Sequence, residues 1–346
     1  MRLIVVIVSY NVRELLAACL RSVFASLARS PELAAEVWVV DNASSDGSAA
    51  MVREQFPQVK LIASEENLGF AGGNNVALKA LGFKSKAQSS KPKHAIRNTQ
   101  YAIRFTHHAP PDFVLLLNPD TEVLDDAIGR MAGFLAEHPH VGGVGAQLQY
   151  PDGRFQHGAF SFPGLVQLWF DFFPPRPRRL LDSRLNGRYP LRWYERGEPF
   201  PIGFALGAAL MVRREAIEAV GLLDEGYFMY AEEVDWCWRM QRAGWPLYCV
   251  PAARVVHHGG ASARQFREQS YLNLWRSRRR LYEKFYGPLK RWLAYRIVRL
   301  GMWAESRRAR RAAARGEISE AELRKRLTTY REISALYRTR SSQPGT

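Results

Sequence analysis

The sequence predicts an α/β fold with a mostly parallel sheet flanked by helices, followed by a basic helical extension. Short apolar runs alternate with segments whose apolar residues recur at helical spacing, a pattern typical of parallel sheets with right-handed crossovers. Residues 263–346 carry 22 Lys and Arg against seven Asp and Glu, which is nearly all of the net charge of +16. We expect an α/β domain over residues 1–265 and a basic helical extension over residues 266–346.

Apolar runs that stop at turn-forming residues predict strands. They lie at residues 3–8, 36–40, 59–63, 113–117, 142–149, 246–250 and 254–256. Segments with helical apolar spacing predict helices. They lie at residues 13–27, 49–55, 75–81, 126–137, 214–220 and 231–243, and the chain beyond residue 270 is helical and basic.

Residues 83–111 interrupt the alternation with a polar, basic and aperiodic stretch. A crossover needs only a few loop residues, so we predict an inserted, mobile surface loop, with a specificity lid as the alternative. Residues 160–201, rich in Pro, aromatics and Arg, give no readable secondary structure.

Cysteine usage and the apolar runs indicate a cytoplasmic protein. Cys19, Cys237 and Cys249 are far apart and match no metal-binding spacing, which suggests a reducing compartment. The first apolar run is short and has no small-residue cleavage site after it, so a strand is favoured over a signal peptide. No later stretch reaches the roughly 18 apolar residues of a membrane span.

The stretch FVLLLNPDTE, residues 113–122, places a carboxylate at the edge of the predicted sheet. Pro119 has no amide hydrogen with which to extend the ladder, so the strand ends before Asp120. Ligands bind at this edge of open α/β sheets, where a carboxylate can hold a divalent cation against phosphate oxygens. The alternative is that Asp120 caps the next helix while Asn118 makes the turn.

Asp41 ends another buried strand and is expected at the same edge. Its carboxylate can accept hydrogen bonds from a base N–H or from ribose hydroxyls, and an Asx turn is the alternative. Gly69, Gly72 and Gly73 lead into the next predicted helix. Such a loop lets backbone amides approach an anion, although glycine-rich turns are common.

Six segments occur in order: VVIVSYN, VVDNASSDGS, NLGFAGGNN, LLLNPDTE, FMYAEEVDWCWRMQRAGW and VVHHGGAS. Together they resemble the family 2 glycosyltransferases with a GT-A fold, in particular the bacterial rhamnosyltransferase-like group that builds cell-surface polysaccharide. The resemblance covers roughly residues 3–285. It implies a GT-A (nucleotide-diphospho-sugar transferase) domain that moves a sugar from a nucleotide-sugar donor to a glycan or lipid-linked acceptor.

The resemblance implies a donor and metal site. Asp120 occupies the second acidic place of the family's Asp-X-Asp motif and would bind Mg²⁺ or Mn²⁺, while Asn118 replaces the first Asp. His257, the first His of HHGGAS, would complete the metal site, with His258 the weaker candidate. A divalent ion neutralises the charge that develops on a diphosphate leaving group. The implied donor-binding residues are Ser9, Asn11, Asp41, Gly72, Gly73, Asn74 and Asn118.

The segment AEEVDW supplies the implied catalytic carboxylates, Glu232, Glu233 and Asp235. The family pattern is Glu-Asp-X-Asp, and its second residue is the usual base. Glu233 stands in that place and would take the proton of the acceptor hydroxyl during an inverting transfer, with Glu232 as the competing candidate. The structural alternative is an acidic helix N-terminus with a surface pair between Asp235 and Arg239.

The basic extension includes a helix with an apolar stripe and cationic flanks. The stripe consists of Leu289, Trp292, Leu293, Arg296, Ile297 and Leu300. Such a helix can lie in the headgroup region of an anionic bilayer, or pack on the domain with a solvated basic face. No recognition motif supports nucleic-acid binding. We expect a protein that is peripheral on the inner face of the plasma membrane.

The leading hypothesis is therefore an inverting, metal-dependent glycosyltransferase of cell-surface polysaccharide synthesis. The alternative is a non-catalytic protein of the same fold that binds nucleotide or glycan and is tethered to the membrane by its basic tail. The change from Asp to Glu at position 233 is the sequence feature that favours this alternative. The sequence does not specify the sugar, the base, the acceptor, the linkage or the oligomeric state.

Overall fold

The structure is a computed structural model that describes residues 1–85, 110–259 and 267–338. The chain forms two compact units. The sheet unit comprises Met1–Phe162, Pro190–Phe228 and Glu232–Arg264. The helical unit comprises Pro163–Tyr189, Met229–Ala231 and Gln265–Thr346. The helical unit thus draws on more than the C-terminal extension, and a domain boundary at residue 265 stays a prediction.

The first half of the sheet is parallel, as the alternation of strands and helices predicts. Its strands are β1 (Arg2–Ser9), β2 (Ala34–Asp41), β3 (Lys60–Ala63) and β4 (Phe113–Leu117). They lie in the order β3-β2-β1-β4. The chain therefore adds β2 and β3 on one side of β1 and then places β4 on the other side. β4 is buried along its whole length, because its five apolar side chains face helices or sheet neighbours on both sides.

The second half of the sheet is mixed. β11 (Ala209–Arg213) runs antiparallel to both β4 and β6 (Gly143–Gln149). β12 (Leu247–His257) runs parallel to β6 and antiparallel to β5 (Thr121–Val123). β12 is one strand with an irregularity between Val250 and Arg254, where the sequence predicts two short strands.

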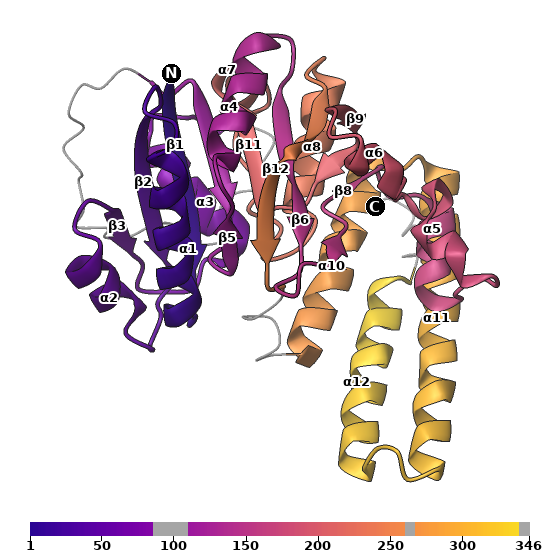
Figure 1. Ribbon diagram of the computed structural model, residues 1–346. Coiled ribbons are helices and arrows are strands. Elements are labelled where there is room, and N and C mark those ends of the chain that lie inside the picture. The colour runs from indigo at the N-terminus through magenta and orange to yellow at the C-terminus, as the bar shows by residue number, and fades with distance from the viewer. Residues whose placement is uncertain (86–109, 260–266, 339–346) are drawn as a thin grey trace, which may run out of the picture. The chain divides into compact units, whose positions relative to one another are not determined.

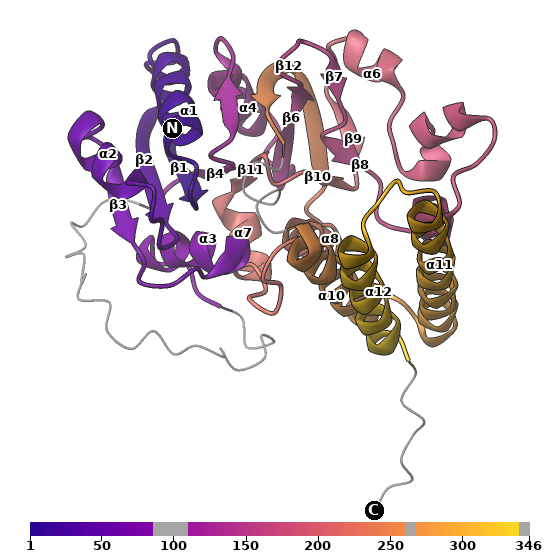
Figure 2. The ribbon, with the colours of Figure 1, turned by 90° about the horizontal axis from the view of Figure 1, so that it is seen from below.

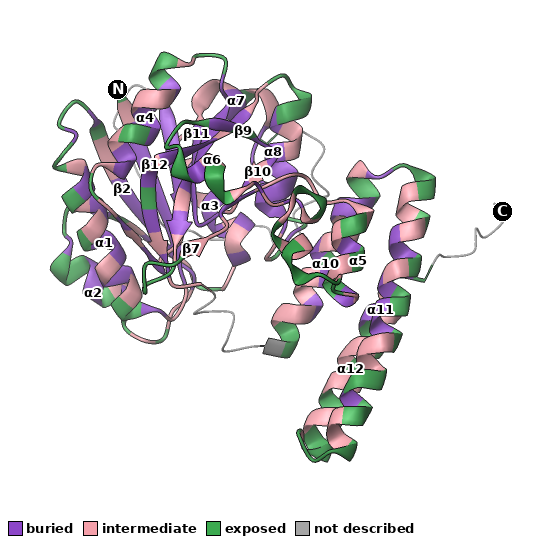
Figure 3. Cartoon of the chain, turned by 45° about the vertical axis from the view of Figure 1, so that its right-hand side comes forward, coloured by how far each residue is buried: buried purple, intermediate pink, exposed green. Residues whose placement is uncertain are grey.

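Helices cover both faces of this sheet, as Figure 2 shows. The helices α1 (Arg13–Leu27) and α4 (Ala127–Glu137) cover one face, and α3 (Gly69–Ala80), α7 (Arg214–Val220) and α8 (Glu232–Arg242) cover the other. The strands between them are buried (Figure 3). Smaller elements of this unit are α2 (Ser48–Gln55), α6 (Leu191–Glu195), β7 (Phe155–Gln156), β8 (Ala159–Phe160), β9 (Phe200–Ile202) and β10 (Phe204–Ala205).

The helical unit is built from long helices, visible in Figure 1. They are α10 (Arg267–Phe285), α11 (Pro288–Ala314) and α12 (Glu320–Leu336). An earlier segment of the chain adds α5 (Leu165–Phe172) and the short 3₁₀ helices η1 (Arg178–Asp182) and η2 (Arg184–Asn186). Trp275 stacks on Phe172 with 5.0 Å between ring centroids, and the Tyr337 hydroxyl donates to the Trp275 carbonyl at 2.7 Å. The segment that gave no sequence signal thus supplies part of the unit's aromatic core.

Two expectations concern segments beyond these elements. The insertion predicted at residues 83–111 lies largely outside the described residues. Among the helices that the structure describes, none combines the length and apolar character needed to cross a bilayer.

Candidate active site

Ser9 and Asp41 are the last residues of two neighbouring parallel strands. β1 and β2 pair in register from Arg2 with Ala34 to Ser9 with Asp41, so both side chains lie at the carboxyl edge of the sheet. The Asn42 amide donates to the Ser9 carbonyl at 2.8 Å and continues the ladder by one residue. The parallel register predicted from the sequence therefore brings these two residues together.

The polar atoms of this pair are only partly satisfied by the protein. One carboxylate oxygen of Asp41 accepts from the Ser44 amide at 3.1 Å, so this oxygen stabilises the turn that the sequence offered as the alternative role of Asp41. The other oxygen, Oδ1, and the Ser9 hydroxyl are buried and have no hydrogen-bond partner among the described residues. Because an unmade hydrogen bond to a buried polar atom costs free energy, these atoms are available for a ligand.

Asn11 organises the loop that follows. Its backbone φ is +51°, in the left-handed region that Asn tolerates better than most residues. Its side-chain oxygen accepts from the Ser45 amide at 2.8 Å, and its own amide donates to the Ser44 hydroxyl at 3.0 Å. Asn11 thus joins the loop after β1 to the loop after β2, beside Asp41.

The glycine-rich segment is helical, which corrects the expected loop over residues 67–75. α3 begins at Gly69 and includes Gly72, Gly73 and Asn74. A Cβ at Gly73 would lie 2.6 Å from Val8 Cγ1 and 3.3 Å from Asn42 Nδ2, so only glycine lets the helix approach the strand ends this closely. The Asn74 side chain is buried and donates to the carbonyl of Phe70 at 2.9 Å.

The turn Asn118-Pro119-Asp120 is fixed from several sides. The Asn118 amide donates to the Ala208 carbonyl at 3.0 Å, and the Asn118 carbonyl accepts from the Thr121 hydroxyl at 2.7 Å. Asp120 leads into β5, so the alternative in which it caps a following helix is excluded. The turn thus holds Asp120, which is 6% exposed, at the same edge as Ser9.

His257 lies beside Asp120 because β12 and β5 pair. His257 is opposite Thr121 in the ladder, and its Nε2 is 3.5 Å from Asp120 Oδ1. Both ring nitrogens of His257 are buried without a hydrogen-bond partner among the described residues. His258 differs, because its Nε2 lies 2.8 Å from a Glu122 carboxylate oxygen. A carboxylate and an unengaged imidazole are thus neighbours at this point.

Glu233 lies in the first turn of α8, close to the loop that binds Asn118. A Cβ placed on Gly207 would lie 3.8 Å from Glu233 Cβ and 3.2 Å from Phe70 Cζ, so the three residues are neighbours. Gly207 directly precedes Ala208, the acceptor for Asn118. Burial raises the pKa of the Glu233 carboxyl from 4.5 to about 7, against the smaller opposing effect of the helix amides. Glu233 therefore titrates near neutral pH and lies against the loop at 207–208 that accepts the Asn118 amide.

Asp235, two residues later, is held by the protein itself. It is fully buried, and its oxygens accept from Arg239 Nε at 2.7 Å and from the Tyr227 hydroxyl at 3.3 Å. Arg239 also donates to the carbonyls of Val220 and Leu222. The pair with Arg239 is therefore not the surface pair considered from the sequence, and it ties α8 to the loop after α7.

Glu232 is also buried in the first turn of α8. Burial alone therefore does not decide whether Glu232 or Glu233 is the base. The raised pKa of Glu233 and its close approach to Gly207 favour Glu233.

Direct contacts connect the predicted site residues in two groups. Ser9, Asn11 and Asp41 form one group with the start of α3, and Asp120 and His257 form the other. Within the part of the chain that the structure describes, no three His, Cys, Asp or Glu side chains converge as a complete metal-ligand set. Ser9 on β1 is one strand away from the end of β4, so both groups belong to one edge.

Sequence reasoning missed Gly207, Phe70 and Thr121. Thr121 fixes the turn through its hydroxyl, and the Asn-Pro-Asp-Thr spacing is a signal that could have identified it. Gly207 lies in an apolar stretch of small residues that shows no local pattern. Its position between Phe70 of α3 and Glu233 of α8 is therefore seen only in the packed structure.

Known proteins resemble this chain in sequence and in fold. The family model "Glycosyl transferase family 2" matches residues 4–81. The N-acetylglucosaminyl-diphospho-decaprenol L-rhamnosyltransferase of Mycobacterium tuberculosis (strain ATCC 25618 / H37Rv) is 30% identical over 241 residues, which cover 68% of this chain and 70% of that protein. The low-salt glycan biosynthesis hexosyltransferase Agl10 of Haloferax volcanii is 22% identical, with 68% and 63% covered.

Among solved structures, the mannosyltransferase PcManGT from Pyrobaculum calidifontis, in complex with GDP-Man and Mn²⁺, aligns with a TM-score of 0.52 and 18% identity, over 97% of this chain and 83% of that chain. This likeness concerns the fold and confirms the GT-A architecture expected from the sequence motifs. The alignment with the M. tuberculosis rhamnosyltransferase spans 241 residues, many more than the residues 4–81 that the family model matches. The chain belongs to glycosyl transferase family 2 and is a rhamnosyltransferase-like glycosyltransferase.

Proposed function

We propose that this glycosyltransferase is inverting and metal-dependent, and that it transfers a sugar from a nucleotide-sugar donor to a glycan or lipid-linked acceptor of cell-surface polysaccharide. The observations that support the proposal are two: Asp120 lies beside His257, and the turn that precedes Asp120 bonds through the Asn118 amide to the loop at 207–208, which also contacts the high-pKa residue Glu233. The M. tuberculosis relative is named as an L-rhamnosyltransferase. Rhamnose is therefore the first donor sugar to test.

Donor binding is assigned to the edge of β1 and β2. The unpaired Asp41 Oδ1 can accept a hydrogen bond from a base N–H or a ribose hydroxyl, and the Ser9 hydroxyl can donate one. Gly72, Gly73 and Asn74 place the start of α3 beside this pair, so the nucleoside would lie against the helix. Asn11 keeps the loops in place, and Asn118 joins this edge to the metal side.

Metal binding is assigned to Asp120 and His257. Their oxygen and nitrogen atoms are a donor set that Mn²⁺ accepts, and an Asp with waters and phosphates also suits Mg²⁺. The unpartnered ring nitrogens of His257 support this fit. A divalent ion held there would neutralise the diphosphate that leaves from the donor. Since no third protein ligand is close among the described residues, donor phosphates would complete the coordination.

Proton transfer is assigned to Glu233. Inversion requires a carboxylate that removes the acceptor hydroxyl's proton as its oxygen attacks the anomeric carbon. A pKa of about 7 makes Glu233 a stronger base than an ordinary carboxylate while leaving it ionised at mildly alkaline pH. Glu232 remains the competing base. Asp235, bound by Arg239 and Tyr227, would position α8 and thereby Glu233.

Membrane association is assigned to one face of α11. Leu289 is 71% exposed and Trp303 is 55% exposed. The exposed residues Leu289, Trp292, Arg296, Leu300 and Trp303 recur every three or four positions and so share a face. Arg296 lies over the Trp292 ring and Arg307 over the Trp303 ring. Apolar rings between guanidinium groups suit the headgroup region of an anionic bilayer, as expected for an enzyme with a lipid-linked acceptor.

The proposal is tested with Asp120→Ala and a matched control, Asp112→Ala. Asp112 directly precedes the opposite end of the same strand and is exposed. Release of nucleotide diphosphate is measured over a panel of nucleotide sugars, with EDTA and with added Mn²⁺ or Mg²⁺. We expect metal-dependent turnover in wild type and in Asp112→Ala, and none in folded Asp120→Ala. Turnover by Asp120→Ala at the wild-type rate would remove the metal assignment.

A further inference from the structure

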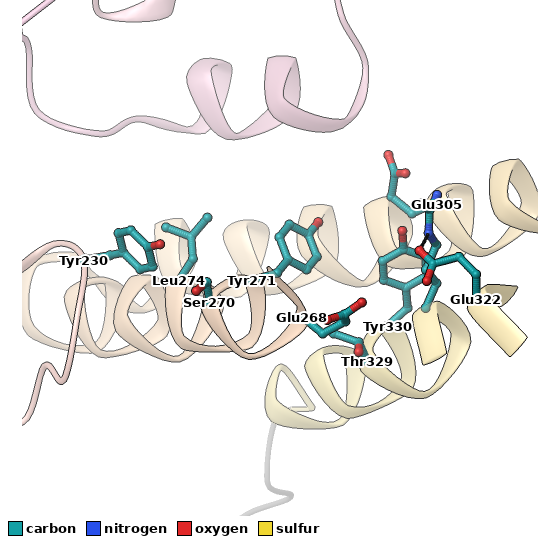
Figure 4. Close-up of a pocket in the computed structure, with 10 residues that line it drawn as sticks. Tyr230, Glu268, Ser270, Tyr271, Leu274, Glu305, Glu322, Thr329 and Tyr330 are labelled. Carbon is teal, nitrogen blue, oxygen red and sulfur yellow. Dashed lines mark hydrogen bonds and ion pairs between the residues drawn. The ribbon is translucent and has the colours of Figure 1, made fainter. Parts of the chain in front are cut away.

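The helical unit contains a cavity that the site at the sheet edge does not use. It has a volume of about 520 Å³, within the range of roughly 300–1,000 Å³ that small-molecule sites occupy. Figure 4 shows its lining residues projecting from α10 and α12, together with Glu305 of α11 and Tyr230. The cavity lies wholly within this unit.

The lining combines aromatic rings with many oxygen atoms. Tyr271 and Tyr330 lie with their ring centroids 6.2 Å apart and their planes at 73°, so they form two walls of a corner. Ser270 and Thr329 add hydroxyl groups, and the Thr329 oxygen, whose proton goes to the Lys325 carbonyl at 3.2 Å, can accept a hydrogen bond. A ligand with apolar ring faces and several hydroxyls matches both kinds of wall.

The charges of the lining favour a neutral ligand over a cation or a metal. Glu322 accepts from Arg326 Nε at 2.7 Å, and Glu305 is paired with Arg308. Glu268, an exposed residue, is the third lining carboxylate. Two of the three carboxylates already have guanidinium partners, so most of the negative charge of the lining is offset, and the cavity offers many hydrogen-bond donors and acceptors. Nor do the described residues include a set of three that could hold a metal ion.

Tyr230 connects the cavity to the catalytic segment through the chain. Tyr230 lines the cavity and stands three residues before Glu233 in the sequence. Tyr230 and Ala231 have φ angles of 73° and 66°, a left-handed conformation that is uncommon for residues other than glycine. The strained pair Tyr230 and Ala231 thus directly precedes the carboxylates at the start of α8.

We propose that this cavity binds a saccharide portion of the acceptor, an inference that rests on the proposed glycosyl transfer. The ring faces of the sugar would lie against Tyr271 and Tyr330, and its hydroxyls would bond to the carboxylates and hydroxyls of α10 and α12.

Binding is measured by saturation-transfer NMR on the full chain, without donor, using N-acetylglucosamine, L-rhamnose and tetramethylammonium as probes. The cavity variant is Thr329→Trp, which fills the space. The matched control is Thr328→Trp, the same substitution at the adjacent exposed position of α12. We expect at least one sugar to bind wild type and Thr328→Trp equally, and to bind Thr329→Trp at least tenfold more weakly. Thermal unfolding of each variant verifies the fold.

A second variant, Glu268→Gln, separates a neutral ligand from a cationic one. A saccharide should lose no more than a few-fold in affinity, since the change keeps a hydrogen-bonding group of the same size. The proposal is overturned if neither sugar binds, if Thr328→Trp weakens binding as much as Thr329→Trp, or if only tetramethylammonium binds. These readouts need no turnover. A failure of the proposed enzyme function is seen instead as absent donor-dependent sugar transfer by wild type.

Discussion

Buried polar groups at the sheet edge and in helix α8 differ in whether the protein supplies their hydrogen-bond partners. At the edge, Asp41, Ser9 and His257 are buried with polar atoms that the described protein leaves unpaired. In α8, Asp235 is also buried, but it is held by Arg239 and Tyr227. Burial alone therefore does not distinguish a functional carboxylate from a structural one. The distinguishing feature is whether the protein supplies the partners.

Glu233 and Asp235 are both buried in α8, and in the described structure only Asp235 of the two is paired with a guanidinium group. The largest expected effect comes from Glu233→Gln, which keeps the shape of the side chain but removes the base. We expect kcat for transfer to fall by about 10²–10⁴, measured by product formation with saturating donor. Glu232→Gln is the matched control and should lose much less. If Glu232→Gln is the more damaged variant, the roles of the two residues are exchanged.

Asp235→Ala should instead reduce stability. It leaves Arg239 without its buried anion, and breaking such a pair costs about 3–5 kcal/mol. We expect the lower end of that range, because Arg239 keeps its bonds to two carbonyls. Urea unfolding measures the change.

The control for this variant is Asp126→Ala, which breaks the exposed pair with Arg130 at the same spacing on α4. Exposed pairs contribute about 0–1 kcal/mol. Equal losses from the two variants would contradict the structural role of Asp235.

Stability should depend on pH through Glu233. Its folded pKa is raised, so its protonated form favours folding below about pH 4.5, and this contribution is lost as the pH rises through about 7. Relative to Glu233→Gln, wild type should lose about 2–3 kcal/mol of unfolding free energy between about pH 5 and about pH 8. Urea unfolding of both proteins at the two pH values measures this. If the difference in unfolding free energy between wild type and Glu233→Gln is the same at both pH values, Glu233 is in a more solvated environment than the structure indicates.

The smallest expected effect is on metal affinity. His257→Ala should raise the Mn²⁺ concentration needed for half-maximal activity by at least about 10–100-fold, since losing even an outer-shell partner of a metal ligand typically costs that much affinity. His140→Ala, at an exposed position of the same unit, serves as the control. Unaltered Mn²⁺ dependence in His257→Ala would leave Asp120 as the one assigned protein ligand.

The parallel half of the fold could be predicted because its signals are local. The run at 113–117 and its Pro119 stop specify β4 and the turn at Asp120. The apolar run that forms β11 gives no direction, because burial on both faces looks the same in parallel and antiparallel strands. Its antiparallel pairing with β4 depends on contacts far apart in sequence.

The site shows the same limit. Glycines at 69, 72 and 73 argue locally against a helix, but the close approach of Gly73 to Val8 favours one through packing. The sequence placed Asp235 and Arg239 on one face of a helix, yet it could not tell whether that face points to solvent or to Tyr227. Both questions are decided by tertiary contacts that no short window contains.

The most direct test of a catalytic carboxylate at this edge is the pH dependence of kcat/KM for sugar transfer, compared between wild type and Glu233→Gln. We predict that kcat/KM of wild type rises with an apparent pKa of about 7 and reaches a plateau at higher pH, whereas the residual activity of Glu233→Gln shows no such rise. A wild-type profile that does not rise near pH 7, or a Glu233→Gln profile that still rises there, would contradict the account.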